Sequence, residues 1–397
     1  MSTVSPAWSR EPNFCCTLLI SGFLTKHPIV LAESARCALS ANMAALSSRE
    51  TAANPARGVQ EQESSIPRHK ILLLGPRRAG KSSLCKVVYQ SFQPNDTLFL
   101  APTTRTQKLP VQTFQRLEIW DVPGSVLHEF APNTVGGNAA PAASETALNV
   151  SWREVSAIIF VVDAQDDYFD ALSRLNQVIL RAYQNNPEIH FHIFINKVDG
   201  LSDDYKYDTQ RDIEQRVFEE LIDSSHEFQD SSMEPLRLEN EVNLRFHLTS
   251  VFDSSVFVAF SRIQQGLMQS EGGSGQVTDP RAGLDTEQQP SPERVISLYE
   301  AVEMACNTLC SSCSLEKAYL FDVPSRTFVG CDSSPFDLPL FDVMFQYTKF
   351  LTEFSDLYFA ATAETAQPAR TWSSSVVRLG SDTSVAFWQL NKCVSLT

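Results

Sequence analysis

The nine residues 75–83, GPRRAGKSS, have types and a spacing that suit the binding of a phosphate group. They follow a short apolar run and precede an amphipathic segment, which is the strand–loop–helix context of the motif G-x-x-x-x-G-K-S. Gly75 and Gly80 let backbone N–H groups turn toward the anion, and a helix beginning near Ser82 directs its positive dipole end at it. Lys81 is expected to bridge the β- and γ-phosphates, and Ser82 to hold Mg2+. The loop residues predicted to contact nucleotide are Gly75, Arg78, Ala79, Gly80, Lys81, Ser82 and Ser83.

Two later motifs supply residues for the other parts of a nucleotide site, the γ-phosphate with its Mg2+ and the base. Asp121 and Gly124 form D-x-x-G, in which the aspartate can hold the Mg2+ shell through water and the glycine N–H can meet a γ-phosphate. Residues 196–199 read NKVD, and the carboxylate of Asp199 can accept two hydrogens from the N1 and N2 edge of guanine. Adenine does not offer that pattern, so the sequence predicts guanine as the base.

The neighbours of Asp199 are expected to support it. Asn196 would tie the NKVD loop to the phosphate loop, the stem of Lys197 would lie along the base plane, and the backbone around Ser250 would complete the base site. Each motif alone also fits an ordinary glycine turn or polar strand end. Their order along the chain, each after a predicted strand, favours the nucleotide interpretation.

The elements that must position these residues alternate from residue 71 to about 269. Predicted strands lie at residues 71–74, 117–120, 157–162, 191–195 and 244–250, and amphipathic helices at 167–184 and 209–222. Such alternation predicts an α/β fold with a mostly parallel sheet and helices on both faces, as in P-loop NTPase G domains. Ligands of such sheets bind at the carboxyl ends of the strands, where the motifs fall.

Bulk composition narrows the partner classes. The net charge of -15 argues against nucleic acid or an anionic membrane surface, and no apolar run is long enough for direct membrane insertion. Nine cysteines without framework spacing suit a reducing compartment. Cys306, Cys310 and Cys313 have the C-x-x-x-C-x-x-C spacing of an iron–sulfur site, but the apolar residues around them favour a helix instead.

The flanking regions are interpreted separately. Residues 1–67 are expected to be a disordered tail or a mispredicted gene start with Met43 as the true start, although the apolar stretch 14–24 also resembles a signal-peptide core. Residues 270–292 are rich in glycine, proline and charge and are predicted to be a linker. Residues 68–269 then form the G domain, and 293–397 a smaller α+β domain.

The smaller domain shows helical patterns at 293–309 and 341–354. Its predicted strands lie near residues 317–323, 327–332, 375–379 and 385–390. It has no visible catalytic constellation, so a role in protein interaction is inferred by elimination.

The sequence resembles the Rag GTPases of the C/D class over most of residues 68–395. The resemblance rests on ILLLGPRRAGKSSLCKVVY, NDTLFL, IWDVPG, FVVDAQDDYFDALSRL, NKVDGLSDD, TQRDI, LTSVFDSSVFVAFS, EKAYLFDV and CDSSPFD. It implies a Ras-like switch that binds GTP or GDP with Mg2+ and hydrolyses GTP. It further implies an obligate heterodimer with an A/B-class Rag GTPase through a roadblock-like C-terminal domain.

The resemblance also implies a cellular setting. The heterodimer would sit on lysosomal or vacuolar membranes through a scaffold complex and recruit the TOR kinase complex when amino acids are plentiful, with the C/D subunit signalling in its GDP state. Lys81, Thr103 and Gly124 would serve catalysis, and Ser82, Thr103 and Asp121 would hold Mg2+. Thr103 would be the first-switch threonine, with Thr104 and Thr97 as neighbouring alternatives.

Two residues depart from the family pattern in ways that lower the expected rate of GTP hydrolysis. Ser125 stands where a glutamine would position the attacking water, and Arg77 fills a position beside the γ-phosphate that small GTPases often keep as glycine. Slow intrinsic hydrolysis that depends on a GTPase-activating protein is therefore expected.

Two segments also differ from the family. Residues 131–149 form an alanine-rich insertion in the second switch region, and the chain ends where the family continues with a strand and a helix, so that a truncated domain with an exposed sheet edge is expected. The alternative to a switch is a nucleotide-static scaffold that acts only through protein interactions. An ATP-dependent kinase or ATPase leaves NKVD unexplained.

Overall fold

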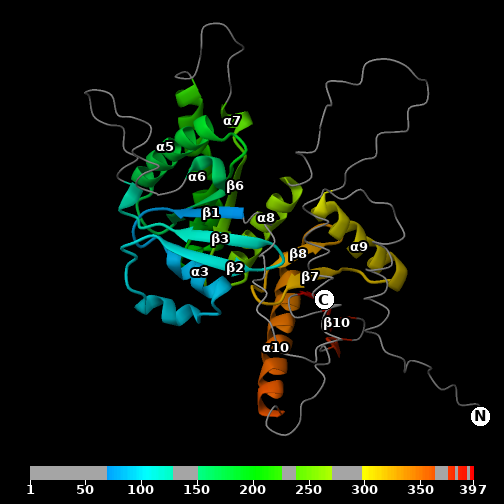
Figure 1. The fold of residues 1–397 in the computed structure, drawn as a ribbon. Helices are drawn as coiled ribbons and strands as arrows, with labels where there is room; N and C mark the ends of the chain where they lie inside the picture. The colour runs from blue at the N-terminus through cyan, green and yellow to red at the C-terminus, as the bar shows by residue number, and fades with distance from the viewer. Residues whose placement is uncertain are drawn as a thin grey trace, which may run out of the picture. The chain divides into compact units, whose positions relative to one another are not determined.

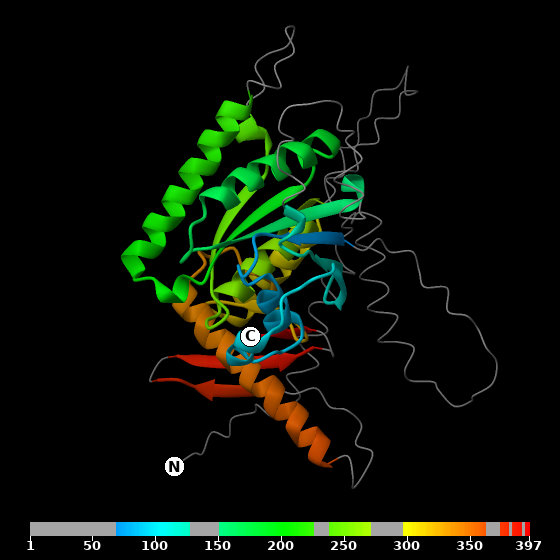
Figure 2. The same cartoon turned by 90° about the vertical axis from the view of Figure 1, so that its left-hand side faces the viewer.

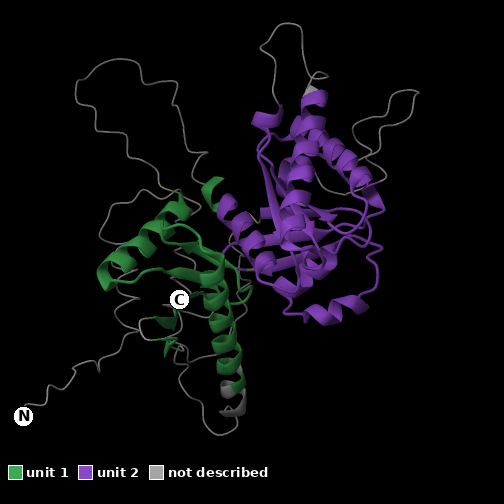
Figure 3. Cartoon of the chain, turned by 180° about the vertical axis from the view of Figure 1, so that it is seen from behind, with its two compact units in different colours: residues 1–64, 268–397 green, residues 65–267 purple. Residues whose placement is uncertain are grey.

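The computed structural model describes residues 69–127, 151–225, 238–270, 297–362, 374–380, 383–390 and 394–397 (Figure 1). They fall into two compact units, one within residues 65–267 and the other within 268–397 (Figure 3). The predicted tail 1–67, the insertion 131–149 and all but the first residue of the predicted linker 270–292 lie outside the described residues.

The unit within residues 65–267 contains a six-stranded sheet. Its strands are β1 (His69–Leu74), β2 (Gln107–Gln112), β3 (Arg116–Asp121), β4 (Val155–Asp163), β5 (His190–Asn196) and β6 (Leu244–Thr249). The spatial order is β2-β3-β1-β4-β5-β6, with β2 antiparallel to β3 and the other pairs parallel. The five predicted strands are confirmed, and β2 is an edge strand that the sequence patterns did not predict.

Helices cover both faces of this sheet. They are α3 (Lys81–Tyr89), α5 (Phe169–Asn185), α6 (Asp203–Ser225), α7 (Leu238–Glu241) and α8 (Ser255–Ser270), with 3-10 turns at Pro94–Phe99, Trp152–Glu154 and Val198–Gly200. Helices α5 and α6 lie on one face of the sheet (Figure 2), and buried residues of both helices belong to the core there. On the other face, the ring of Phe260 on α8 meets the rings of Tyr89 on α3 and Phe194 on β5 edge to face.

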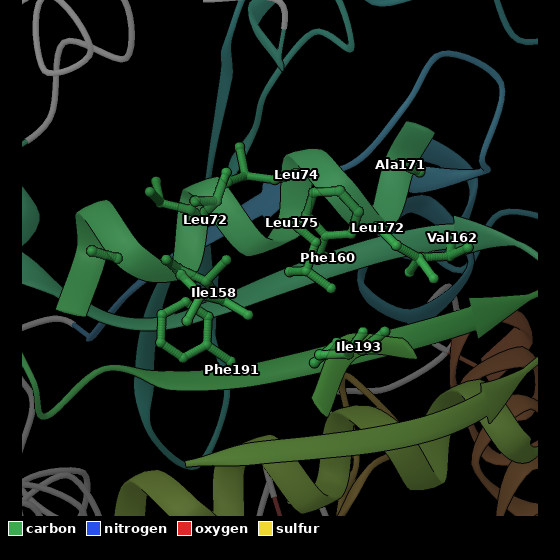
Figure 4. Close-up of a cluster of buried hydrophobic side chains, with 14 of the residues drawn as sticks. Leu72, Leu74, Ile158, Phe160, Val162, Ala171, Leu172, Leu175, Phe191 and Ile193 are labelled. Atoms are coloured by element: carbon green, nitrogen blue, oxygen red, sulfur yellow. The ribbon is translucent and has the colours of Figure 1, made fainter. Parts of the chain in front are cut away.

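The core under α5 shows why these segments pack. Apolar residues recur along α5 at three- and four-residue spacing, so they form one stripe, and Leu172 and Leu175 on it are almost fully buried. They lie against Leu72, Ile158 and Phe160 of the central strands (Figure 4). The central strands β1 and β4 are buried on both faces over most of their length and therefore read as nearly continuous apolar runs. This packing fixes the strand ends where the polar motifs emerge.

The unit within residues 268–397 is a smaller α+β unit. Its described elements after α8 are α9 (Leu298–Cys313), β7 (Tyr319–Asp322), β8 (Phe328–Cys331), α10 (Leu338–Thr362), β9 (Ser374–Arg378), β10 (Ser384–Gln389) and β11 (Val394–Leu396). The strands form an antiparallel sheet in the order β8-β7-β11-β10-β9. This arrangement fits the predicted roadblock-like domain.

Two details of this unit differ from the sequence-based boundaries. The first helix begins at Leu298 because Ser297 caps it: the Ser297 hydroxyl accepts from the Glu300 N–H, and the Glu300 carboxylate accepts from the Ser297 N–H. The unpredicted strand β11 lies at the centre of the sheet between β7 and β10, so the sheet edges are β8 and β9.

The cysteine motif lies on α9, as the helical interpretation predicted. Cys306 is buried, Cys310 is half-buried and Cys313 is exposed, and all are free thiols. Within the described ranges, no group of histidine, cysteine and acidic side chains is arranged to hold a metal ion. None of the helices that can be described there is long and apolar enough to cross a membrane.

Candidate nucleotide site

The phosphate loop joins the carboxyl end of β1 to the start of α3. Gly75 and Gly80 have φ angles of 144° and 98°, which side chains rarely adopt. A Cβ on Gly75 would lie 2.4 Å from the Val161 carbonyl oxygen, and one on Gly80 would lie 2.4 Å from Nδ2 of Asn196. Both glycines are therefore required by conformation and by space, and the loop turns tightly at the N-terminus of α3.

Lys81, the first residue of α3, reaches back across this loop. Its ammonium group donates to the carbonyl oxygens of Gly75 and Pro76, at 2.8 Å each. Burial lowers the pKa of Lys81 to about 8, an effect that the nearby Asp121 carboxylate partly opposes. The lysine is still mainly protonated at neutral pH, so a positive charge is held where the motif places a phosphate.

The predicted Mg2+ ligands lie together. The Ser82 hydroxyl is 2.7 Å from the Thr103 hydroxyl and donates to Oδ2 of Asp121 at 2.5 Å, and Thr103 donates to the same oxygen at 3.4 Å. The other candidate, Thr97, instead donates to the Pro94 carbonyl oxygen at 2.6 Å. The geometry thus favours Thr103 as the first-switch residue, as proposed from the sequence.

Asp121 provides a test of whether a cation fits here. Its Oδ1 atom is buried without a hydrogen-bond partner among the described residues, and burial raises the pKa of its carboxyl group. Hydrogen bonds from Ser82 and the charge of Lys81 oppose that rise. An oxygen-only donor set with an unsatisfied carboxylate oxygen matches the preference of Mg2+.

The D-x-x-G segment packs directly on the phosphate loop. A Cβ on Gly124 would lie 2.6 Å from the Arg77 backbone nitrogen and 2.9 Å from the Pro76 carbonyl carbon. The Val122 N–H donates to the Leu73 carbonyl oxygen at 3.2 Å, so this segment is held to the end of β1. Ser125 follows directly and is half-buried.

The predicted tie between the two loops is present. Nδ2 of Asn196 donates to the Ala79 carbonyl oxygen at 2.8 Å, and its Oδ1 accepts from the Thr249 hydroxyl at 3.3 Å. The buried Asn196 therefore links the end of β5 to the phosphate loop and to the end of β6.

Asp199, the residue predicted to recognise guanine, is held by a hydrogen bond from another loop. Oδ1 of the exposed Asp199 accepts from the hydroxyl of the buried Ser250 at 2.7 Å. That hydroxyl also accepts from the Phe252 N–H at 3.1 Å, which anchors the serine to its own loop. The sequence interpretation gave Ser250 a backbone role, whereas the structure shows a side-chain contact to Asp199.

The predicted site residues thus fall into two groups. Gly75, Ala79, Gly80, Lys81, Ser82, Thr103, Asp121, Gly124, Asn196, Asp199 and Ser250 are joined by the contacts given above. Arg78 has a left-handed backbone with φ of 65° and an exposed side chain, and Ser83 is half-buried on α3. The ammonium group of Lys197, whose stem is predicted to lie along the base plane, pairs with the carboxylate of Asp163. Sequence reasoning quoted the DAQDD segment as a family signature but gave Asp163 and Gln165 no role.

Comparison with known proteins agrees with this architecture. A model of the Gtr1/RagA G protein conserved region matches residues 70–272. The GTP-binding protein gtr2 of Schizosaccharomyces pombe is 36% identical over 332 residues, which cover 82% of this chain and 88% of that protein. Human Ras-related GTP-binding protein C is 33% identical over 336 residues, which cover 84% of this chain and 70% of that protein.

More distant similarity extends to another relative. The GTP-binding protein gtr1 of Schizosaccharomyces pombe is 24% identical over 203 residues, which cover 49% of this chain and 55% of that protein. The similarity to gtr2 and to protein C is higher and spans both units. The chain therefore belongs to the Gtr/Rag family of small GTPases, in its C/D class.

Proposed function

We propose that this chain is a guanine-nucleotide switch that binds GTP and GDP and hydrolyses GTP slowly. The observation that carries the proposal is the connected base loop: Asp199 is held by Ser250, and the same loop is tied by Asn196 to the phosphate loop. A carboxylate at this position selects guanine over adenine, because it accepts hydrogens that only guanine presents.

The residues around Asp121 would bind the phosphates of the nucleotide and the Mg2+ ion. Ser82, Thr103 and Asp121 would hold Mg2+, which when bound neutralises phosphate charge. Lys81 supplies a buried positive charge, and Gly124 packs closely against the backbone of the same loop. The packing of Gly124 on Arg77 would couple the second switch to the presence of a γ-phosphate.

Nucleotide competition tests this proposal. The chain, coexpressed with an A/B-class partner, is loaded with a fluorescent guanine nucleotide, and GTP, GDP, ATP and XTP compete for wild type and Asp199→Asn. Wild type is expected to prefer guanine by orders of magnitude. The variant is expected to lose GDP affinity by roughly a hundredfold or more, since two hydrogen bonds to a charged acceptor are lost. It should gain affinity for XTP, whose carbonyl accepts from the new amide.

A matched variant, Asp208→Asn, removes an exposed carboxylate from α6 in the same unit, outside the site. It should bind like wild type. Equal competition by ATP would point to an adenine-dependent enzyme, and absence of tight binding by any nucleotide would support a scaffold that acts only through protein contacts.

The proposed setting follows from family membership. We infer that the chain pairs with an A/B-class Rag GTPase, and that the pair associates peripherally with a lysosomal or vacuolar membrane through a scaffold complex. There it relays amino-acid sufficiency to the TOR kinase complex, and a GTPase-activating protein accelerates its slow hydrolysis. The similarity to gtr1 of Schizosaccharomyces pombe, a relative of the A/B type, supports the pairing.

A further inference from the structure

The ends of β4 and β5 bring two sequence motifs side by side. Asp163, the last residue of β4, is in register with Asn196, the last residue of β5. The Ala164 N–H donates to the Asn196 carbonyl oxygen at 2.9 Å, so the pairing continues past the strand ends. The segment DAQ at residues 163–165 therefore lies along the NKVD loop that carries Asp199.

Lys197 is the strained point of that loop. Its φ of 65° lies in the left-handed region, which is unfavourable for a residue with a side chain. The 3-10 turn Val198–Gly200 begins directly after it and contains Asp199. The conformation of Lys197 thus sets the direction in which Asp199 leaves the sheet, and whatever holds Lys197 also fixes Asp199.

Two side chains from the DAQ segment hold Lys197. Nε2 of Gln165 donates to the Lys197 carbonyl oxygen at 2.7 Å, and the Lys197 ammonium donates to Oδ2 of Asp163 at 2.5 Å. The other oxygen of Asp163 accepts from the Gln165 N–H at 3.0 Å. One carboxylate therefore fixes both the lysine head group and the backbone of the glutamine that binds the lysine carbonyl.

Gln165 also contacts the far side of the turn. A Cβ on Gly200 would lie 2.3 Å from Nε2 of Gln165 and 2.8 Å from its Cδ, so the amide group rests on the Gly200 backbone. Asp199 lies between the two contact points, Lys197 and Gly200. Because Gln165 is itself exposed, its amide can be removed without opening a cavity in the core.

We propose that Asp163 and Gln165 are positioning residues for base selection, which hold the NKVD turn so that Asp199 meets the guanine edge. They do not touch the base. This inference rests on the proposed function, because it assigns the way in which the same site achieves specificity. It predicts that their loss affects the contact to the guanine amino group more than the contacts to phosphate.

The test compares GDP with IDP, which lacks the exocyclic amino group and so offers Asp199 one hydrogen fewer. Dissociation rates and affinities for both nucleotides are measured on the heterodimer for wild type, Asp163→Asn and Gln165→Leu. Both variants are expected to release GDP about tenfold faster than wild type. Their preference for GDP over IDP should fall severalfold, since Asp199 is no longer fixed against the amino group.

Matched controls separate this effect from general damage. Asp170→Asn breaks an exposed ion pair with Arg174 on α5, and Gln215→Leu breaks an exposed hydrogen bond to Glu219 on α6. Both should behave as wild type. Ser82→Ala, at the phosphate end, should weaken GDP and IDP equally and leave their ratio unchanged.

The outcomes distinguish a failure of the proposed function from a failure of the roles proposed for Asp163 and Gln165. If wild type does not prefer GDP over IDP and ADP, the guanine assignment fails and this inference fails with it. If wild type prefers GDP and the two variants keep the wild-type ratio, Asp163 and Gln165 have no part in base selection and the proposed function stands. Thermal unfolding without nucleotide confirms folding, and the exposed Gln165 provides a variant whose stability should match wild type.

Discussion

At the scale of single residues, Gly124 has no room for a side chain between the D-x-x-G segment and the phosphate loop. A methyl group there would sit 2.6 Å from the Arg77 nitrogen and 2.9 Å from the Pro76 carbonyl carbon, and backbone atoms cannot move aside as side chains do. Gly124→Ala must therefore push the second switch away from the phosphate loop.

This displacement leads to a specific prediction. Gly124→Ala should weaken GTP binding about tenfold while leaving GDP affinity nearly unchanged, because only the γ-phosphate depends on the Gly124 N–H. Gly380→Ala is the control, since a Cβ there meets no atom within 4 Å. The affinities of both nucleotides are measured by competition. An equal loss for GTP and GDP would mean that the variant damages the whole loop rather than the switch.

A second prediction at this scale concerns Ser125 and the rate of GTP hydrolysis. Its hydroxyl is too short to orient an attacking water as a glutamine does, so hydrolysis in the absence of an activating protein should be slow. Single-turnover hydrolysis of bound GTP is the measurement, and Ser125→Gln should raise the rate severalfold. A wild-type rate near the roughly 5–20 per second of an activated Ras protein would contradict the expectation.

At the scale of elements, long apolar runs were predictable and short irregular strands were not. The central strands β1 and β4 read as nearly continuous apolar segments because both their faces are buried, whereas β3 and β6 carry polar residues between their apolar ones. By contrast, β2 has the sequence QKLPVQ, with Pro110 in the middle and polar ends, which is tolerated at a sheet edge but carries no strand signal. Likewise β11 has only three residues, and its place between β7 and β10 depends on long-range pairing.

In the candidate site, too, some features could be predicted from the sequence and others could not. Motif spacing predicted which residues come together at the strand ends, because nucleotide chemistry constrains the residue types of such motifs directly. It did not predict the supporting contacts, since the bond between Gln165 and Lys197 joins residues 32 positions apart and depends on the register of β4 and β5. Sequence also left Thr97, Thr103 and Thr104 open, and the side-chain contacts of Ser82 and Asp121 favour Thr103.

The strands β5 and β6 also carry a histidine pair, in which His192 is buried and His247 is half-buried. Nδ1 of His192 lies 3.1 Å from Nε2 of His247, and the rings stack with centroids 5.3 Å apart. Burial lowers the pKa of His247 to about 4, and Arg245 and Arg262 favour its neutral form further. Burial likewise lowers the pKa of His192 well below its usual range, and the charges of His247, Arg245 and His190 act in the same direction. Both imidazoles are therefore neutral in the folded protein at neutral pH.

Because of this histidine pair, we expect the folded protein to lose stability as the pH falls. In the unfolded chain each imidazole takes up a proton near pH 6.5, whereas in the folded chain it resists protonation. The stabilisation is thus complete above about pH 6.5 and is lost as pH falls toward 4, by roughly 3 kcal/mol for His247. Urea unfolding of the nucleotide-binding unit between pH 7.5 and 4.5 is the measurement. The double variant His192→Phe, His247→Phe should flatten the slope, and an unchanged slope would refute the assignment.

At the scale of the whole molecule, the two units divide the work. The residues predicted to contact nucleotide all lie within residues 65–267, and the described part of residues 268–397 shows no group of metal-binding side chains. That second unit instead exposes large apolar side chains on α10. Phe350, Phe354 and Leu357 are 61%, 55% and 71% exposed, and the two phenylalanine rings stack with centroids 5.8 Å apart. Exposed apolar side chains gathered on one helix usually mark a surface that another protein covers.

If the chain pairs with an A/B-class GTPase as proposed, the stripe formed by Phe350, Phe354 and Leu357 is a candidate for the interface, and this can be tested. Phe350→Asp with Phe354→Asp places two charges on α10 and should weaken the heterodimer by roughly a hundredfold, because buried charges without partners are costly. GDP affinity should not change, as the nucleotide site lies in the other unit. Tyr205→Asp with Tyr207→Asp on α6 makes the same chemical change at exposed aromatic residues of the nucleotide-binding unit and should leave pairing intact. Pairing is measured by copurification and by titration calorimetry, and wild-type affinity in the α10 variant would exclude this stripe from the interface.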